Sequence, residues 1–199
     1  MLQYLYKNWA HMCGVMALYL TILLVSVFHC LDPYVFLVWL QFPVYLIHEF
    51  EEHAWPGGFK QFINKNIFGI QGVDQPLTDA RVFWINILGV WVLFPVVALA
   101  TQWINPLYGL LAPCFGLFNA SLHIVWAIGL RRYNPGLLAS VFLNYPTGIY
   151  TIFVAHNMGY FSVPALLGAS VFAFVSHVII FLAVLHWYRE YAKRGQISD

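Results

Sequence analysis

The chain has 199 residues, of which 61% are hydrophobic and only 9% are charged. A soluble domain typically carries about 25% charged residues, so this composition excludes an ordinary soluble fold and indicates an integral membrane protein. The net charge of +1 arises without a basic run, so no nucleic-acid partner is expected. The three cysteines form no CxxC pair, and the sequence therefore predicts neither a disulfide framework nor a zinc knuckle.

Helices are expected where apolar runs approach the ~20 residues that cross the hydrocarbon core of a bilayer. Such runs lie near residues 12–30, 34–53, 82–101, 107–130, 135–155 and 163–187. The first run lacks a small-x-small cleavage site, so it is interpreted as a retained helix, with a signal peptide as the alternative. We therefore predict one domain over residues 1–199, an all-α polytopic membrane helical bundle of about six transmembrane helices.

The positions of the basic residues predict the orientation of this bundle. All nine Lys and Arg residues fall at the N-terminus, in the second or fourth connecting segment, or in the C-terminal tail, which share one side of a six-span bundle. The other connections, around residues 29–33, 102–106 and 156–162, contain none. Because basic segments are retained in the cytoplasm, both termini are expected there, and a five- or seven-span arrangement would spoil the pattern.

The long connection 54–80 is expected on the same cytoplasmic side. Apolar residues recur in it at helical spacing, and they are Phe59, Phe62, Ile63, Ile67 and Ile70. The polar residues expected to face elsewhere are Lys60, Gln61, Asn64 and Lys65. This pattern favours an amphipathic helix in the membrane interface, with a loop packed over the helices as the alternative. The segment could also act as a lid over a site that opens to the cytoplasmic leaflet.

The second apolar run ends in an acidic cluster, His48-Glu49-Phe50-Glu51-Glu52-His53. The run follows Asp32-Pro33, and the fourteen residues up to Ile47 rise only ~21 Å, short of the ~30 Å hydrocarbon core. We therefore expect the helix to continue to about His53 and to bury the cluster in the cytoplasmic leaflet. Carboxylates at that depth cost several kcal/mol each unless they are protonated, paired or bound to a metal.

Three side chains of this cluster share one face of the predicted helix. His48 precedes Glu51 by three residues and Glu52 by four, while Glu49 and His53 form a second i,i+4 pair on a rotated face. Imidazole and carboxylate groups together make a metal-ligand set, so His48 and Glu52 are predicted ligands and Glu51 a general base or second carboxylate ligand. The alternatives are a proton-sharing carboxylate cluster and charges that reach the aqueous interface.

The fourth run offers a third ligand. His123 lies ~12 Å inside the cytoplasmic end of that run and His48 lies ~9 Å inside the end of its own, so the two histidines are at similar depth. Asn119 precedes His123 by four residues and shares its face, where it could hydrogen-bond a ligand or a substrate. His177, about half-way along the sixth run, is a fourth candidate ligand.

Other polar residues lie within or at the ends of the runs. Asn86 is near the inner end of the third run, and Asn144 lies in the fifth, where Pro146 is expected to produce a kink. Both asparagines could contact a substrate or hold helices together. Arg131 ends the fourth run, where it complements the helix dipole or turns inward to pair with the acidic cluster or an anionic substrate group.

Three short patterns occur in order along the chain. His48-Glu49-Phe50-Glu51-Glu52 matches HXXEE, Asn119 and His123 match an Asn and a His four apart, and Arg131-Arg132-Tyr133-Asn134-Pro135-Gly136 matches RxxNPG. With these patterns the sequence resembles the HXXEE family of membrane proteins, whose function is largely unassigned. The resemblance spans roughly residues 48–136 and supplies no reaction. It implies that the important positions are His48, Glu51, Glu52, Asn119, His123, Arg131 and Asn134.

The leading functional hypothesis is a metal-dependent intramembrane enzyme, a hydrolase, that takes an apolar or lipid-like small molecule from the cytoplasmic leaflet. A divalent metal, zinc by preference or iron, would activate water there. The predicted metal ligands are His48, Glu52, His123 and His177. The predicted catalytic residues are Glu49, Glu51, Asn119 and Arg131, and the predicted substrate-binding residues are Asn86, Asn134 and Asn144.

Several other functions fit the same residues. Glutamates in an apolar pocket could drive an acid/base isomerisation or cyclisation, and carboxylates with histidines could hold two irons in an oxidase. A metal or proton transporter is the main non-enzyme alternative, but the acids lie at one end of their helix and no inverted repeat is evident. A structural role is the last alternative, although helix association does not require three acids. Membrane lipid is the expected partner in every case.

Overall fold

The computed structural model describes residues 1–194, and every regular element in that part of the chain is helical. The predicted all-α class is therefore confirmed. The α-helices are α1 (Leu2–Ser26), α2 (Pro33–His53), α3 (Phe59–Asn66), α4 (Asp79–Asn86), α5 (Leu93–Trp103), α6 (Leu111–Leu130), α7 (Leu137–Ala139), α8 (Tyr145–Asn157) and α9 (Val163–Lys193). Short 3-10 turns are η1 (Phe28–Cys30) and η3 (Pro106–Leu110), and π-helical turns are η2 (Ile87–Val92) and η4 (Ser140–Asn144).

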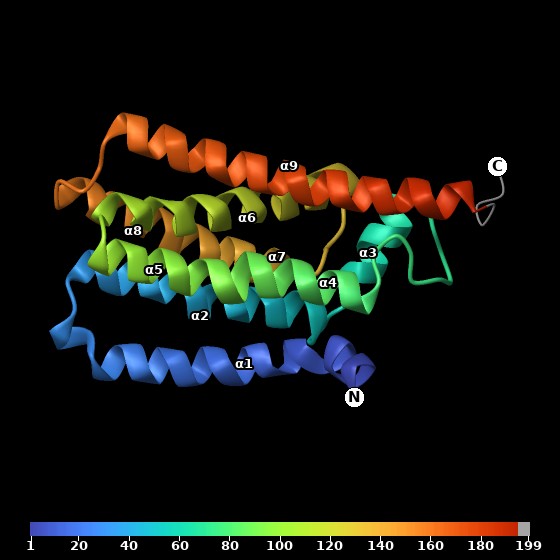
Figure 1. Ribbon diagram of the computed structural model, residues 1–199, viewed down its shortest axis with the longest axis horizontal. Coiled ribbons are helices and arrows are strands. Elements are labelled where there is room, and N and C mark those ends of the chain that lie inside the picture. Colours follow the sequence, from blue (N-terminus) through green and yellow to red (C-terminus); the bar gives the residue numbers. More distant parts are fainter. Residues whose placement is uncertain (195–199) are drawn as a thin grey trace.

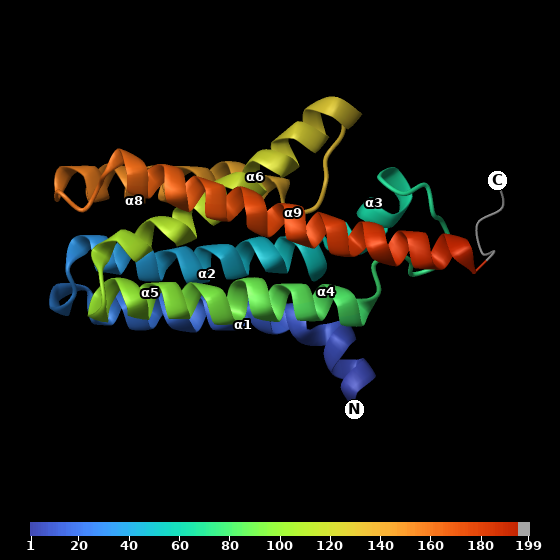
Figure 2. The same ribbon diagram turned by 45° about the horizontal axis from the view of Figure 1, so that its top comes forward.

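The long helices run along one common axis and form a bundle (Figure 1). α1 begins and α9 ends at the same end of the bundle, and α3 lies at that end as well. Turned by 45°, the bundle shows α1, α4 and α5 on one side of α2 and α6, α8 and α9 on the other (Figure 2). α2 is therefore central, and 13 of its 21 residues are buried.

Five helical stretches of the described chain are long and apolar enough to cross a membrane, which suggests a membrane protein. They are Leu2–Ser26, Asp79–Trp103, Pro106–Leu130, Leu137–Asn157 and Val163–Lys193. Large apolar side chains are exposed along their outer faces, as lipid contact requires. α2 is not among them, and it is more polar because it carries Gln41 and the acidic cluster. That α2 also crosses the membrane stays a prediction. The first helix begins ten residues before the predicted start, because its polar first turns continue the helix beyond the apolar run.

The start of α2 and its packing against α1 follow from local chemistry. The Asp32 carboxylate caps α2 by accepting hydrogen bonds from the Tyr34 and Val35 amides, at 2.9 and 3.3 Å. α1 packs against α2, and three of the five buried residues of α1 are small, namely Ala10, Cys13 and Ala17. Small side chains let two apolar helices approach closely, which sets the depth at which α2 presents its polar end.

The fifth predicted run contains the expected irregularity. η4 occupies residues 140–144 directly before Tyr145 and Pro146, and a proline that removes one backbone donor is a common cause of such a distortion. The π-helical turn widens the helix between α7 and α8. One consequence is that Ser140 is fully buried and faces His48 on α2.

The connection between α2 and α4 differs from the predicted amphipathic helix. α3 has buried Phe62 and Ile63 as expected, but Lys60 and Asn64 on its polar face are buried as well. Asn64 donates to the Leu77 carbonyl and accepts from the Leu77 amide, both at 2.9 Å. The prediction that these polar residues face away was wrong, because the chain after α3 folds back over them.

The Lys60 side chain closes this fold-back. Its ammonium group donates to Asp74 at 2.6 Å and to Asp79, the first residue of α4, at 2.5 Å. Burial alone would lower the pKa of Lys60, but the two carboxylates outweigh it and raise the pKa above its usual range. α3 is thus tied over the end of the bundle, in agreement with the alternative of a loop packed over the helices.

Candidate functional site

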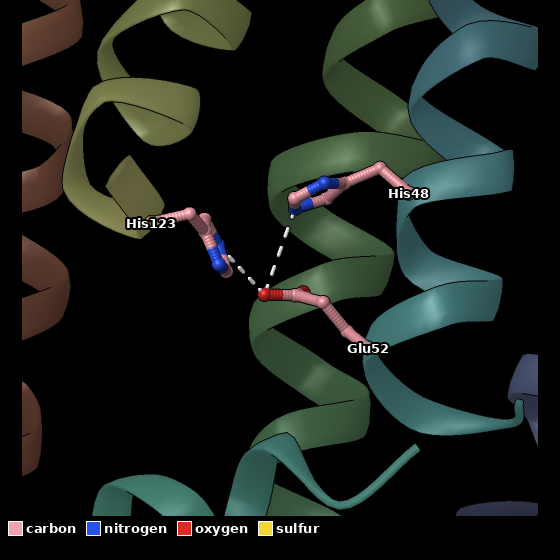
Figure 3. Close-up of side chains that lie close together, drawn as sticks. All are labelled: His48, Glu52 and His123. Carbon is pink, nitrogen blue, oxygen red and sulfur yellow. Dashed lines mark ion pairs between the residues drawn. The ribbon is translucent and has the colours of Figure 1, made fainter. Parts of the chain in front are cut away.

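Three side chains from two helices converge at the end of the bundle that α3 covers. His48 and Glu52 are one turn apart on α2, and His123 projects from α6 (Figure 3). Glu52 Oε1 lies 3.6 Å from His48 Nε2 and 3.0 Å from His123 Nε2. Both imidazoles are fully buried and Glu52 is 3% exposed. The prediction that these three residues meet is confirmed, and it rested on their spacing and depth.

The converging atoms have no hydrogen-bond partner among the described residues. His48 Nε2, Glu52 Oε1 and His123 Nε2 are all buried and unpaired, since the short contacts between them lack hydrogen-bond geometry. Buried polar atoms are normally satisfied, because an unpaired one costs about 1–3 kcal/mol. Three such atoms aimed at one point therefore indicate a site for a ligand that completes them.

Asn134 determines which nitrogen of His123 carries a proton. Its Nδ2 donates to the His123 carbonyl at 2.9 Å, so its Oδ1, 2.7 Å from His123 Nδ1, must accept. His123 Nδ1 is thus a donor, and Nε2 of the neutral ring presents a lone pair to Glu52. Two acceptors that face each other at 3.0 Å repel unless a cation or a proton lies between them.

The spacing of these atoms fits a metal ion. Two atoms that each lie ~2.1 Å from a tetrahedral zinc are ~3.4 Å apart. The observed separations of 3.0 and 3.6 Å lie on either side of this value. His48, Glu52 and His123 offer ligand atoms that all lie within 4.8 Å of one another.

Gly136 closes the cluster from the α6–α7 connection. Its φ of +94° lies in the left-handed region, and a Cβ built on it would lie 2.7–2.9 Å from His123 Cε1, Glu52 Cγ and His48 Cε1. Only glycine therefore fits between the three residues. Ser140 Oγ lies 3.4 Å from His48 Nδ1 on the far side of that ring.

Glu51 does not join this cluster, which corrects the prediction that it is a base or ligand there. Its Oε1 accepts from the Tyr133 hydroxyl at 2.7 Å and the Leu138 amide at 3.0 Å, and its Oε2 accepts from the Ala139 amide at 2.6 Å. Glu51 instead ties α2 to the first turn of α7, where a carboxylate complements the helix dipole. Burial and the bond to Glu51 raise the pKa of Tyr133, which keeps its hydroxyl a donor at neutral pH.

A family model described as a protein of unknown function with HXXEE motif matches residues 39–151. The chain belongs to the HXXEE family. The match runs from within α2, where the motif lies, to about the middle of α8, and so includes every residue of the cluster. No curated protein and no solved structure matches the chain.

The HXXEE motif thus divides into two parts with different surroundings. His48 and Glu52 face the cluster, whereas Glu51 faces the start of α7. Asn134, predicted to bind substrate, uses both ends of its amide to position His123. No role was predicted for Gly136 or Ser140, although Gly136 is part of the RxxNPG pattern.

Glu49 and His53 form a second group beside the first. Glu49 Oε2 and Glu52 Oε2 lie 3.5 and 3.3 Å from His53 Nε2. Asn86, predicted to bind substrate or hold helices, contacts this group through its Nδ2, 3.2 Å from His53 Nε2. Within residues 1–194, no Lys or Arg forms an ion pair with either glutamate.

A cavity of about 420 Å³ adjoins the second group. Its wall is mainly apolar and comes from α2, α3, α4, η2, α6 and α9. The polar residues on its wall include Glu49, Glu52, His53, Asn86 and Asn119. His48 and His123 are not on this wall, so the cavity reaches the first cluster through Glu52.

Three predicted site residues lie apart from both groups. His177 borders the cavity, but its Nδ1 is 2.8 Å from the Ala173 carbonyl, and it belongs to neither set of converging ligand atoms, so it is not a fourth ligand here. Arg131 ends α6 with φ of 50° and is exposed, which agrees with the helix-end role and not with inward pairing. Asn144 is buried with neither amide atom paired and is not on the cavity wall.

Proposed function

We propose that this HXXEE protein is a metal-dependent intramembrane enzyme, a hydrolase, that acts on an apolar or lipid-like molecule. The observation that carries the proposal is the convergence of His48 Nε2, His123 Nε2 and Glu52 Oε1, all buried and unpaired. Two imidazoles and one carboxylate, with a further position left for water, make up a typical catalytic zinc site. Zinc would supply a nucleophile by lowering the pKa of that water, and iron is the second candidate metal.

The cavity supports an apolar substrate. A volume of about 420 Å³ with mainly apolar walls is in the range of ligand sites, and Glu52 of the proposed metal site is on the wall. The cavity would accommodate an apolar chain with its reactive group next to Glu52. Membrane lipid is the surrounding partner and the source from which such a substrate would come.

The proposed orientation places this site at the cytoplasmic side. α1 begins and α9 ends at the same end of the bundle, where α3 and the start of α4 also lie (Figure 1). Lys7 belongs to the first turns of α1, Lys60 and Lys65 to α3, and Arg81 to the first turn of α4. If α2 crosses the membrane in addition to the five long apolar stretches, the number of crossings is even, which agrees with this arrangement. The positive-inside rule assigns the basic end to the cytoplasm. A reporter that is active only outside the cytoplasm, fused to the C-terminus, should give no signal, and a strong signal would contradict the six-span orientation.

An acid/base isomerase or cyclase is the second candidate. Glu49 is 1% exposed, its Oε2 is unpaired, and it borders the apolar cavity. A carboxylic acid in such surroundings can protonate an alkene or epoxide. This function needs no metal, so metal analysis separates the two proposals.

The test uses the full chain purified in detergent and loaded with Zn²⁺. Wild-type protein should retain zinc after removal of the free ion, and His48→Ala should lose the ion of the His48, Glu52 and His123 site while the protein still inserts, because insertion depends on apolar length. His186→Ala, at an exposed histidine of α9, is the matched control and should retain zinc. Wild-type protein that binds no zinc, iron or manganese would contradict the metal proposal and favour the acid/base one.

A further inference from the structure

Glu52 uses its two oxygens in two different groups. Oε1 faces His48 and His123, whereas Oε2 lies 3.3 Å from His53 Nε2. Glu49 Oε2 lies 3.5 Å from the same nitrogen. These separations match the ~3.4 Å expected between two ligands of one tetrahedral metal. Glu49, Glu52 and His53 thus have ligand separations similar to those of the first cluster. The two groups share the Glu52 carboxylate, which faces one group with each of its oxygens.

One cation in the first cluster would lie next to Glu52 but not next to Glu49. Glu49 and Glu52 are both buried, and within residues 1–194 no Lys or Arg pairs with them. A divalent cation between His48, Glu52 and His123 would compensate Glu52 and leave Glu49 without a neighbouring positive charge. Glu49 Oε2 is itself buried and unpaired, and it points toward His53. An uncompensated buried carboxylate is costly, so a second cation or a proton is required there.

One tautomer of His53 suits a cation at this point. Asn86 Nδ2 donates to the Val82 carbonyl at 3.1 Å, which identifies this atom as the amide nitrogen. The same Nδ2 lies 3.2 Å from His53 Nε2 and donates to it in the tautomer that leaves Nε2 unprotonated. Oxygens of Glu49 and Glu52 lie 3.5 and 3.3 Å from the same nitrogen. A cation at this point would replace the hydrogen bond from Asn86 and satisfy all three acceptors.

The second group is also the more accessible one. Glu49, Glu52 and His53 line the apolar cavity, and His53 also lines a separate, more polar cavity of about 370 Å³. Asp74 and Asp79 also lie on the wall of the polar cavity, where both are paired with Lys60. A metal site needs an entry path, and this cavity offers one from the surface to His53.

We infer that Glu49, Glu52 and His53 form a second divalent-cation site, bridged by Glu52 to the first and facing the cavity. The inference rests on the proposed metal site and extends it to a two-metal centre. Carboxylate-bridged ions in such centres lie about 3.5–4 Å apart and hold the attacking and leaving oxygens of a substrate between them. The enclosed ion would then anchor Glu52, and the ion at Glu49 and His53 would contact the apolar substrate.

The test is a cation titration of the full chain in detergent. Wild-type protein should bind two Zn²⁺ per chain, and Mn²⁺-loaded protein should give the electron paramagnetic resonance spectrum of an exchange-coupled pair. Glu49→Gln and His53→Asn should each bind one Zn²⁺ and, with Mn²⁺, give the spectrum of isolated ions. His11→Asn, at an exposed histidine of α1, should behave as wild type.

The outcomes separate this inference from the metal proposal. One Zn²⁺ per wild-type chain, lost in His48→Ala and kept in His53→Asn, would overturn the second site and leave the first in place. No bound cation in the wild type would overturn both. Two ions whose number does not change in Glu49→Gln or His53→Asn would also overturn the assignment. The spectrum of the Mn²⁺-loaded wild type does not depend on how well a variant folds, and uncoupled ions there would exclude the Glu52 bridge.

Discussion

Glu51 and Glu52 are neighbours in the HXXEE motif, and both are buried, but they lie in opposite surroundings. Around Glu51 every oxygen accepts a hydrogen bond, from Tyr133, Leu138 and Ala139. Around Glu52 the closest atoms are imidazole nitrogens, and Oε1 has no hydrogen-bond partner among the described residues. Successive residues of a helix point about 100° apart, so one motif can serve two regions.

The difference teaches how the motif combines folding with chemistry. A buried carboxylate that is fully hydrogen-bonded contributes to the stability of the fold. One that converges with unpaired nitrogens contributes little to stability and provides a site for a cation. Glu51 therefore fixes the start of α7, and through it the connection that carries Asn134 and Gly136 to the site.

Removing the charge of Glu51 should weaken its hydrogen bonds to Tyr133, Leu138 and Ala139 and should have the largest effect on stability. Glu51→Gln loses the charge assistance of three hydrogen bonds and turns an amide donor toward a backbone amide, so it should lower the free energy of unfolding by about 3 kcal/mol. Tyr133→Phe, which removes one of the three bonds, should lower it by about 1.5 kcal/mol. Denaturant unfolding in detergent measures both, with Glu190→Gln, at a partly exposed glutamate near the end of α9, as the near-neutral control.

Adding one methyl group at Gly136 should disturb the cluster of His48, Glu52 and His123. Gly136→Ala places a Cβ 2.7–2.9 Å from atoms of His48, Glu52 and His123, so zinc affinity should fall by about 100-fold. Gly58→Ala is the matched control, because Gly58 has a similar φ of +93° but nothing within 4 Å of the added carbon. The control shares the backbone strain without the clash, and equal zinc affinities in the two variants would mean that Gly136 does not shape the site.

Removing the hydrogen bond that orients His123 should lower zinc affinity by a smaller amount. Asn134→Leu removes the acceptor that holds His123 Nδ1, so zinc affinity should fall by about 10-fold. Asn64→Leu removes a similar pair of buried hydrogen bonds, to the backbone of Leu77, away from the site. Both variants should lose stability, but only Asn134→Leu should change the zinc titration. A comparable loss of zinc affinity in Asn64→Leu would assign the effect to general destabilisation.

Much of the bundle and the central cluster could be predicted from the sequence. Apolar length and turn residues located most of the helices, because backbone groups in a bilayer must be satisfied within each segment. His48 and Glu52 followed from their i,i+4 spacing, and His123 from its depth. These arguments use distances along a helix, which the sequence contains.

The remaining parts depend on tertiary contacts that spacing does not encode. Glu51 was expected to face His48, but the start of α7 supplies two backbone amides on its side of α2. Lys60 was expected to face away from the bundle, but Asp74 and Asp79 return to it from the following connection. The contact between His53 and Glu52 was not expected, since adjacent helical residues do not share a face.

The most direct test of the account compares zinc binding by Glu51→Gln and Glu52→Gln, two adjacent and chemically identical changes. Measured per folded molecule, Glu51→Gln should bind zinc as the wild type does, despite its lower stability. Glu52→Gln should unfold close to the wild type in the absence of metal but should lose zinc binding, because it removes the carboxylate that faces His48 and His123. Equal zinc binding in the two variants, or loss in Glu51→Gln alone, would contradict the division of the motif into a folding half and a metal-binding half.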